Sequence, residues 1–355
     1  MSDTAYIEKA KKIITSYDGP ILRIMEVCGT HTHEIFKQGI RTLLPSTIHL
    51  ISGPGCPVCV TPTSFIDEAL YLALEKHVTI CTFGDLVRVP GTKTSLGGAR
   101  ADGAKIHIVY SPLDAVVYAE ENPTEEVVFL SVGFETTTPA SCIAVRNAKQ
   151  SEVKNFSLLT ANKTMYNAYL SLKGSADAFL YPGHVSTMTG TKIYDKLRDE
   201  EGLSGVVTGF TAGELLSALS VIIQNSKKGK PFAINCYPRV VTEEGLPLAQ
   251  KLVDETMEPC DSMWRGLGII EQSGMQLKPC YEAYDARKKY TIPPIEGKPN
   301  PLCQCGEVLK GNCKPYDCSL FGKGCTPEHP IGACMVSSEG ACSAYYKYGE
   351  NVWRK

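Results

Sequence analysis

The chain has 355 residues, of which 43% are hydrophobic and 21% are charged, and its formal net charge is −2. This length predicts two or three domains, and the near-neutral charge argues against nucleic acid or an anionic membrane as the main partner. The polar, amphipathic first residues do not resemble a signal peptide, and no apolar run is long enough to cross a bilayer, so we expect a cytoplasmic protein.

Residues 20–235 repeat one pattern, in which a short apolar run ends in a loop and a helical period follows. Strands that alternate with helices in this way predict βαβ units around parallel sheets. The predicted strands are residues 21–27, 47–52, 77–83, 105–110, 125–132, 156–161, 178–181, 205–210 and 232–237. Because these are many strands for one sheet, we expect two parallel-sheet, Rossmann-like α/β domains, at residues 1–120 and 121–238.

The chain changes character after residue 239. A helix is expected at 246–259 and a mixed segment at 263–278, and residues 290–315 are then rich in Pro, Gly and Lys. Such a segment cannot bury enough apolar surface to order itself, so metal–thiolate bonds are expected to hold it. We therefore predict a cysteine-rich C-terminal iron–sulfur domain at residues 239–355.

Four polar loops follow predicted strands: CGTHTH at 28–33, GPGCPVC at 53–59, GFETTTP at 133–139 and PGHVSTMTG at 182–190. Ligands of parallel α/β sheets bind at the carboxyl ends of the strands. The loops therefore predict one cleft, or two facing clefts if the two domains oppose each other.

Cys28 stands between a predicted strand and a predicted helix. The helix dipole is expected to lower the pKa of its thiol, and a thiolate with the imidazole of His31 suits iron or zinc. A buried structural cysteine beside solvated histidines is the alternative.

Cys56 and Cys59 have the spacing of a redox dithiol. No second Cys-x-x-Cys pair exists to complete a zinc site, so a redox pair is favoured over a metal half-site or two packed thiols. Glu135 is the one carboxylate of its loop and a candidate catalytic residue, although simple helix capping by the threonines explains the loop equally well. His184 is a lesser acid–base or ligand candidate.

Fifteen cysteines are unusual in a reducing compartment, where most are not expected to form disulfides. Seven of them lie close together near the C-terminus: Cys303, Cys305, Cys313, Cys318, Cys325, Cys334 and Cys342. Their spacings match neither a zinc finger nor a ferredoxin, and the wide spacing favours a 4Fe-4S cluster over zinc. Spacing alone leaves open which four thiolates would bind it.

These motifs together resemble the HypD family of hydrogenase maturation proteins. The similarity runs in order over nearly the whole chain, through MEVCGTHTHEIFKQGI, ISGPGCPVCVTP, SVGFETTTPA, PGHVSTMTG and CSLFGKGCTPEHPIGACMVSSEGACSAYY. It implies two α/β domains, a third domain with a 4Fe-4S cluster, and a scaffold for the Fe(CN)2CO unit of nickel–iron hydrogenases. The implied partners are a HypC-type small chaperone, a HypE-type cyanide donor and, through HypC, the hydrogenase large subunit.

The resemblance also implies roles for individual residues. Cys28 would bind Fe(II) carrying CN and CO ligands, with His31 beside it, while Cys56 and Cys59 would exchange electrons. For the cluster, the first choice of ligands is Cys318, Cys325, Cys334 and Cys342, with Cys305 competing and Cys313 the weakest candidate.

We therefore hypothesise that the loop of Cys56 and Cys59 faces both the iron at Cys28 and the C-terminal cluster. One alternative is an iron–sulfur-dependent thiol–disulfide reductase that acts on a partner protein and leaves the CGTHTH loop idle. Another is a binding module stabilised by zinc.

Overall fold

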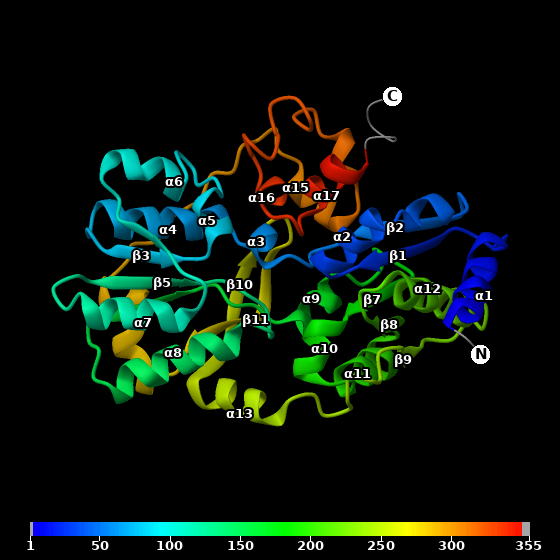
Figure 1. Cartoon of the computed structure of the whole chain (residues 1–355), viewed down its shortest axis with the longest axis horizontal. Helices are drawn as coiled ribbons and strands as arrows, with labels where there is room; N and C mark the ends of the chain where they lie inside the picture. The colour runs from blue at the N-terminus through cyan, green and yellow to red at the C-terminus, as the bar shows by residue number, and fades with distance from the viewer. Residues whose placement is uncertain (1–2, 350–355) are drawn as a thin grey trace.

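The computed structural model describes residues 3–349, and within them nine strands form two parallel sheets (Figure 1). The larger sheet has the order β2-β1-β7-β8-β9, and the smaller has the order β4-β3-β5-β6. The strands are β1 (Leu22–Glu26), β2 (Ile48–Ser52), β3 (Thr79–Thr82), β4 (Ile106–Ile108), β5 (Val127–Ser131), β6 (Phe156–Thr160), β7 (Ala178–Pro182), β8 (Gly205–Thr208) and β9 (Ala233–Asn235). The α/β class and all nine predicted strands are therefore confirmed.

The two sheets share the chain in an interleaved order. The chain builds β1 and β2, leaves to form the smaller sheet from β3 to β6, and then returns to complete the larger sheet. The predicted boundary at residue 120 thus cuts through the smaller sheet, between β4 and β5. The reason is that β3 is buried along its whole length and needs a neighbour on each edge, which β4 and β5 provide.

Helices cover the faces of both sheets and cross between them. They are α1 (Asp3–Thr15), α2 (Gly29–Lys37), α3 (Pro57–Val60), α4 (Thr63–Leu74), α5 (Gly84–Val87), α6 (Leu96–Ala99), α7 (Pro112–Glu121), α8 (Thr138–Gln150), α9 (Met165–Ser171), α10 (Gly183–Thr189), α11 (Lys192–Glu201), α12 (Ala212–Ser226), α13 (Pro247–Thr256), α14 (Ala286–Lys289), α15 (Cys305–Lys310), α16 (Ala333–Val336) and α17 (Ala341–Tyr348). The 3-10 helices are η1 (Ile40–Leu43), η2 (Arg100–Asp102), η3 (Pro279–Tyr284) and η4 (Pro315–Asp317).

The segment expected to be mixed forms an antiparallel hairpin of β10 (Met257–Trp264) and β11 (Gly268–Leu277). Along β10 every second residue is exposed, because only one face of the hairpin packs on the protein. Met257, Met275 and Leu277 join the core beside β5 and β6, so this part of the predicted C-terminal domain packs with the smaller sheet.

The cysteine-rich segment runs across the top of the molecule in Figure 1, where α15, α16 and α17 lie above α3 and α2. No helix within the described part of the chain combines the length and apolar character needed to span a membrane.

A buried ion pair fixes the carboxyl end of β1. Glu26 is fully buried and accepts a 2.6 Å hydrogen bond from Arg41 Nη2, and Thr32 and Ser52 donate to its other oxygen. The Arg41 guanidinium also lies over the ring of Tyr345, 5.4 Å from its centroid. The pair therefore joins β1, β2, α2 and the C-terminal helix α17.

Replacing Arg41 with Met should lower the free energy of unfolding by about 3 kcal/mol, because it leaves the Glu26 carboxylate buried without a counter-charge. Urea titration followed by circular dichroism would measure this change. The matched control is Arg146→Met, which breaks the exposed pair with Glu255 and should cost less than about 1 kcal/mol. Equal losses in the two variants would contradict a stabilising role for the buried pair.

Candidate thiol and iron site

The strand order places Cys28 where ligands of parallel sheets usually bind. The chain steps from β1 to β2 on one side and later adds β7 on the other, so β1 and β7 flank a topological switch point. Cys28 follows β1, and helix α10, which carries His184 where a loop was expected, follows β7. The smaller sheet has its own switch point between β3 and β5, which the loop of Glu135 follows.

Cys28 is the N-cap residue of α2, and only 7% of it is exposed. Burial raises the pKa of its thiol to about 12, and the nearby Glu339 carboxylate adds to the rise. The amides of Thr30 and His31 face the sulfur but only partly oppose this shift. The predicted lowering of the pKa by the helix dipole is therefore wrong, because desolvation of the thiolate outweighs the dipole of a short helix.

The loop that leads to Cys56 lies directly against Cys28. Gly29 N donates to Gly55 O at 3.0 Å, and a Cβ on Gly55 would lie 2.2 Å from the backbone nitrogen of Cys28. Only glycine permits this approach. The same loop therefore carries the Cys-x-x-Cys pair and forms one wall beside Cys28.

Cys56 and Cys59 stand at the two ends of the first turn of α3 and are both buried. The Cys56 sulfur accepts a hydrogen bond from Cys59 N at 3.3 Å. Burial raises the pKa of Cys59 well above its usual value, and the thiols of Cys334 and Cys56 add to that rise. All fifteen cysteines, this pair included, are free of disulfides in the structure.

The C-terminal segment closes over both parts of the site. The Cys334 sulfur contacts the Cys59 thiol, and Cys59 Sγ lies 3.9 Å from the carbonyl oxygen of Ala333. A few residues later, Glu339 Oε1 accepts a 2.7 Å hydrogen bond from Thr30 Oγ1, beside Cys28. One short stretch of chain thus touches the Cys-x-x-Cys pair at one end and the neighbourhood of Cys28 at the other.

The remaining thiols continue from Cys334 as a connected group. Hydrogen bonds from the thiols of Cys305, Cys342 and Cys59 lower the pKa of Cys334. Cys303 and Cys305 contact each other, and a Cβ on Gly332 would come within 2.5 Å of the Cys305 sulfur and 2.6 Å of the Cys303 sulfur.

Five of these cysteines line one small cavity of about 10 Å³, in which sulfur is the dominant donor: Cys303, Cys305, Cys318, Cys325 and Cys342. Thiolates are the ligands that iron–sulfur clusters require, so the donor set fits a 4Fe-4S cluster in its chemistry. Cys313 lies outside this cavity, close to Gln304 on the surface. That fit concerns only the kind of ligand. Within residues 3–349, no three His, Cys, Asp or Glu side chains are placed so that they could hold a metal ion.

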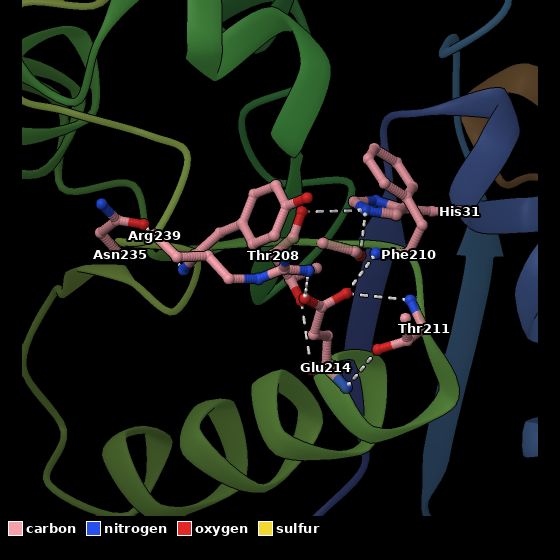
Figure 2. A network of polar contacts seen from close by, with 9 residues as sticks. His31, Thr208, Phe210, Thr211, Glu214, Asn235 and Arg239 are labelled. Carbon is pink, nitrogen blue, oxygen red and sulfur yellow. Dashed lines mark hydrogen bonds and ion pairs between the residues drawn. The ribbon is translucent and has the colours of Figure 1, made fainter.

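The His31 ring points toward the loop after β8, although its amide faces Cys28 (Figure 2). Its Nε2 lies 3.1 Å from the carbonyl oxygen of Gly209 and 3.3 Å from that of Thr208, so Nε2 carries the proton and donates. Nδ1 is buried and has no hydrogen-bond partner. Burial lowers the pKa of His31 to about 4, so the ring is neutral with a free lone pair on Nδ1.

Phe210 separates the two histidines of the candidate site. Its ring centroid is 4.9 Å from that of His31 and 4.1 Å from that of the exposed His184. Figure 2 shows how Glu214 holds this loop: its carboxylate accepts from the amides of Phe210 and Thr211. The loop after β8, which no sequence motif singled out, is therefore part of the surroundings of His31.

Glu135 faces a different group of residues. Its Oε1 accepts a 2.7 Å hydrogen bond from Met165 N, and its Oε2 is buried without a partner. Burial raises the pKa of Glu135 to about 7, and the hydroxyls of Tyr169 and Tyr194 lie nearby. No contact joins Glu135 to Cys28, Cys56 or Cys59 among the hydrogen bonds of the described chain.

Three residues at the site were not among the predicted site residues. The sequence placed Cys303 in the C-terminal cysteine group but not among the candidate ligands, although its spacing to Cys305 brings both thiols to the same cavity. Glu339 and Arg265 carry no local signal, because each reaches the site only through contacts between residues more than 200 positions apart.

Comparison with known proteins agrees with the motifs. Residues 4–349 match the sequence profile of the family described as "HypD: Hydrogenase formation hypA family". The chain is 44% identical to the "Hydrogenase maturation factor HypD" of Escherichia coli (strain K12), over 96% of this chain and 92% of the relative. It is 42% identical to the protein of the same name from Rhodobacter capsulatus, with the same coverage, and 40% identical to the "Hydrogenase expression/formation protein HupD" of Azotobacter chroococcum mcd 1, over 92% of this chain and 89% of that protein.

The buried His31 should make the protein sensitive to mild acid. Its folded pKa of about 4 lies below the ordinary value of 6.5, so its contribution is fully present above 6.5 and is lost as the pH falls toward 4. Between about pH 7 and about pH 5 this loss should amount to about 2 kcal/mol of the free energy of unfolding. Urea titrations at each pH would measure it.

The His31→Leu variant should lose less stability than the wild type over that pH range. The exposed His49 provides a control, since His49→Leu should keep the wild-type pH dependence. Parallel pH profiles for the wild type and the His31 variant would show that another group is responsible.

Proposed function

The chain belongs to the HypD family of hydrogenase maturation factors, and from this we propose that it is the scaffold on which the Fe(CN)2CO unit of nickel–iron hydrogenases is assembled. The observation that carries the proposal is the position of the Cys56/Cys59 loop. It contacts Cys334 through the Cys59 thiol and Cys28 through Gly55. A thiol pair in this place can serve a metal ion on one side and a redox centre on the other.

We propose that four of the thiolates of Cys305, Cys318, Cys325, Cys334 and Cys342 hold a 4Fe-4S cluster, with Cys303 as a further candidate. When bound, such a cluster would supply single electrons to the neighbouring thiol pair. The mobile cargo, Fe(II), would bind the thiolate of Cys28. Because burial raises the pKa of that thiol to about 12, iron must displace a proton that is firmly held, so iron binding should strengthen as the pH rises.

The dithiol of Cys56 and Cys59 is suited to releasing cyanide from a protein thiocyanate. The S–C bond of the thiocyanate breaks, its sulfur leaves as a thiol, and cyanide leaves with one proton. Two electrons and two protons come from Cys56 and Cys59, which become a disulfide. Burial keeps Cys59 protonated until reaction, which slows its oxidation, because the thiolate is the reactive form.

The proposed partners follow from this chemistry. A HypE-type protein would bring the thiocyanate, a HypC-type chaperone would share the iron at Cys28, and the hydrogenase large subunit would receive the finished unit through that chaperone. The cytoplasm, where these cysteines stay reduced, is the proposed location.

The cluster assignment is tested by metal content. Anaerobically purified wild-type protein should be brown and contain iron and acid-labile sulfide in the ratio of a 4Fe-4S cluster, whereas Cys342→Ala should lose most of both. Cys313→Ala is the matched control, because Cys313 lies outside the cavity, and it should keep the cluster. Stoichiometric zinc without iron in the wild type would support a zinc-stabilised module instead.

The scaffold assignment is tested by infrared spectroscopy of protein copurified anaerobically with a HypC-type partner. The wild type should show bands of bound CN and CO, and Cys28→Ala should lose them while keeping the visible absorption of the cluster. Cys280→Ala, at an exposed position, should keep both signals. Wild-type protein with a cluster but no CN or CO bands would favour the thiol–disulfide reductase.

A further inference from the structure

The turn between β10 and β11 reaches the site from below, as Figure 1 shows for the two strands that rise toward α3. Arg265 N donates to Val60 O at 2.7 Å, at the end of α3. Gly266 has a φ of 82°, and a Cβ there would lie 2.3 Å from the Cα of Gly306 in α15. The turn is therefore wedged between the helix of Cys59 and the helix that begins at Cys305.

The Arg265 side chain is anchored on one side only. Its Nε donates to Thr61 O at 2.9 Å, and its Nη1 donates to Thr63 Oγ1 at 3.1 Å. Nη2 is buried and has no hydrogen-bond partner. None of the ion pairs in the described chain gives Arg265 a carboxylate, although a buried cation is costly without a counter-charge.

The cysteines of the cavity are candidates for that counter-charge, because the turn that carries Arg265 packs against α15, which begins at Cys305. The hydrogen bond with Cys305 and burial raise the pKa of Cys303, and the Arg265 charge is close enough to that thiol to oppose the rise. Cys303 lines the same cavity as Cys305, Cys325 and Cys342. Four thiolates around a cluster carry net negative charge, which a neighbouring guanidinium with a free N–H would offset.

We propose that Arg265 is the counter-charge of the thiolate cluster and raises its reduction potential. This inference rests on the proposed function, since it requires a cluster in the cavity. Each added electron makes the cluster more negative, so a fixed positive charge stabilises the reduced state more than the oxidised state. The hydrogen bonds to Thr61 and Thr63 hold the Arg265 guanidinium in its buried position.

Redox titration of the holoprotein, followed by electron paramagnetic resonance, tests the charge directly. In Arg265→Gln the ratio of reduced to oxidised cluster at a given potential should fall about tenfold, which is a shift of about 59 mV to more negative potential for a one-electron couple. Arg265→Lys should restore most of the wild-type potential. Arg146→Gln, which removes a remote exposed arginine, should leave the potential unchanged.

A second pair of variants leaves Arg265 in place. Thr63→Asp would give the guanidinium a carboxylate partner at the first residue of α4 and should also shift the potential downward, whereas the nearly isosteric Thr63→Asn should not. If Arg265→Gln does not hold a cluster, this Asp/Asn comparison decides the question. Unchanged potentials in Arg265→Gln and Thr63→Asp, with intact clusters, would overturn the inference alone, while wild-type protein without a cluster would overturn the proposed function.

Discussion

The buried carboxylate of Glu26 is the constraint on which the arrangement of the site depends. It lies two residues before Cys28, and its three side-chain partners come from α2, η1 and β2. A charge in that position cannot be left without partners, so these elements have to meet at the carboxyl end of β1. The Arg41 guanidinium that neutralises this charge also lies over the ring of Tyr345, so the C-terminal helix α17 packs at the same place.

Starting at Cys28, beside the Glu26 ion pair, the cysteines of the site lie one after another through the molecule. Cys28 stands beside the Gly55 backbone, the same loop continues into Cys56 and Cys59, and Cys59 meets Cys334, which meets Cys305 and Cys342. Every member is buried, and burial opposes ionisation of an isolated thiol. Within the group, hydrogen bonds from Cys305, Cys342 and Cys59 lower the pKa of Cys334. The metal binding proposed for these thiols would have to displace the protons that burial retains.

The sequence was informative wherever the signal is local. Strand positions follow from short runs of buried apolar residues, and the turn at Cys56 follows from its Gly-Pro surroundings. The boundary at residue 120 failed because sequence order does not determine which strands pair, and β3 pairs with β5 across that point. The prediction of a lowered pKa for Cys28 was wrong for a related reason. Residues from the far end of the chain, such as Glu339, surround its thiol, and no local sequence pattern shows them. Separation along the sequence also explains why Arg265 was not predicted, since its partners Thr61 and Thr63 lie some 200 positions earlier.

The interleaved order of the sheets has a consequence for biosynthesis. While a ribosome is still translating the segment between β2 and β7, the larger sheet lacks its middle, and the edge of β1 is unpaired. The walls that bury Cys28 and Cys59 arrive later still, with Ala333, Cys334 and Glu339. A nascent chain therefore has its Cys-x-x-Cys pair uncovered for most of its synthesis. Only a chain translated as far as Glu339 can bury Cys28 and Cys59 behind the same C-terminal segment.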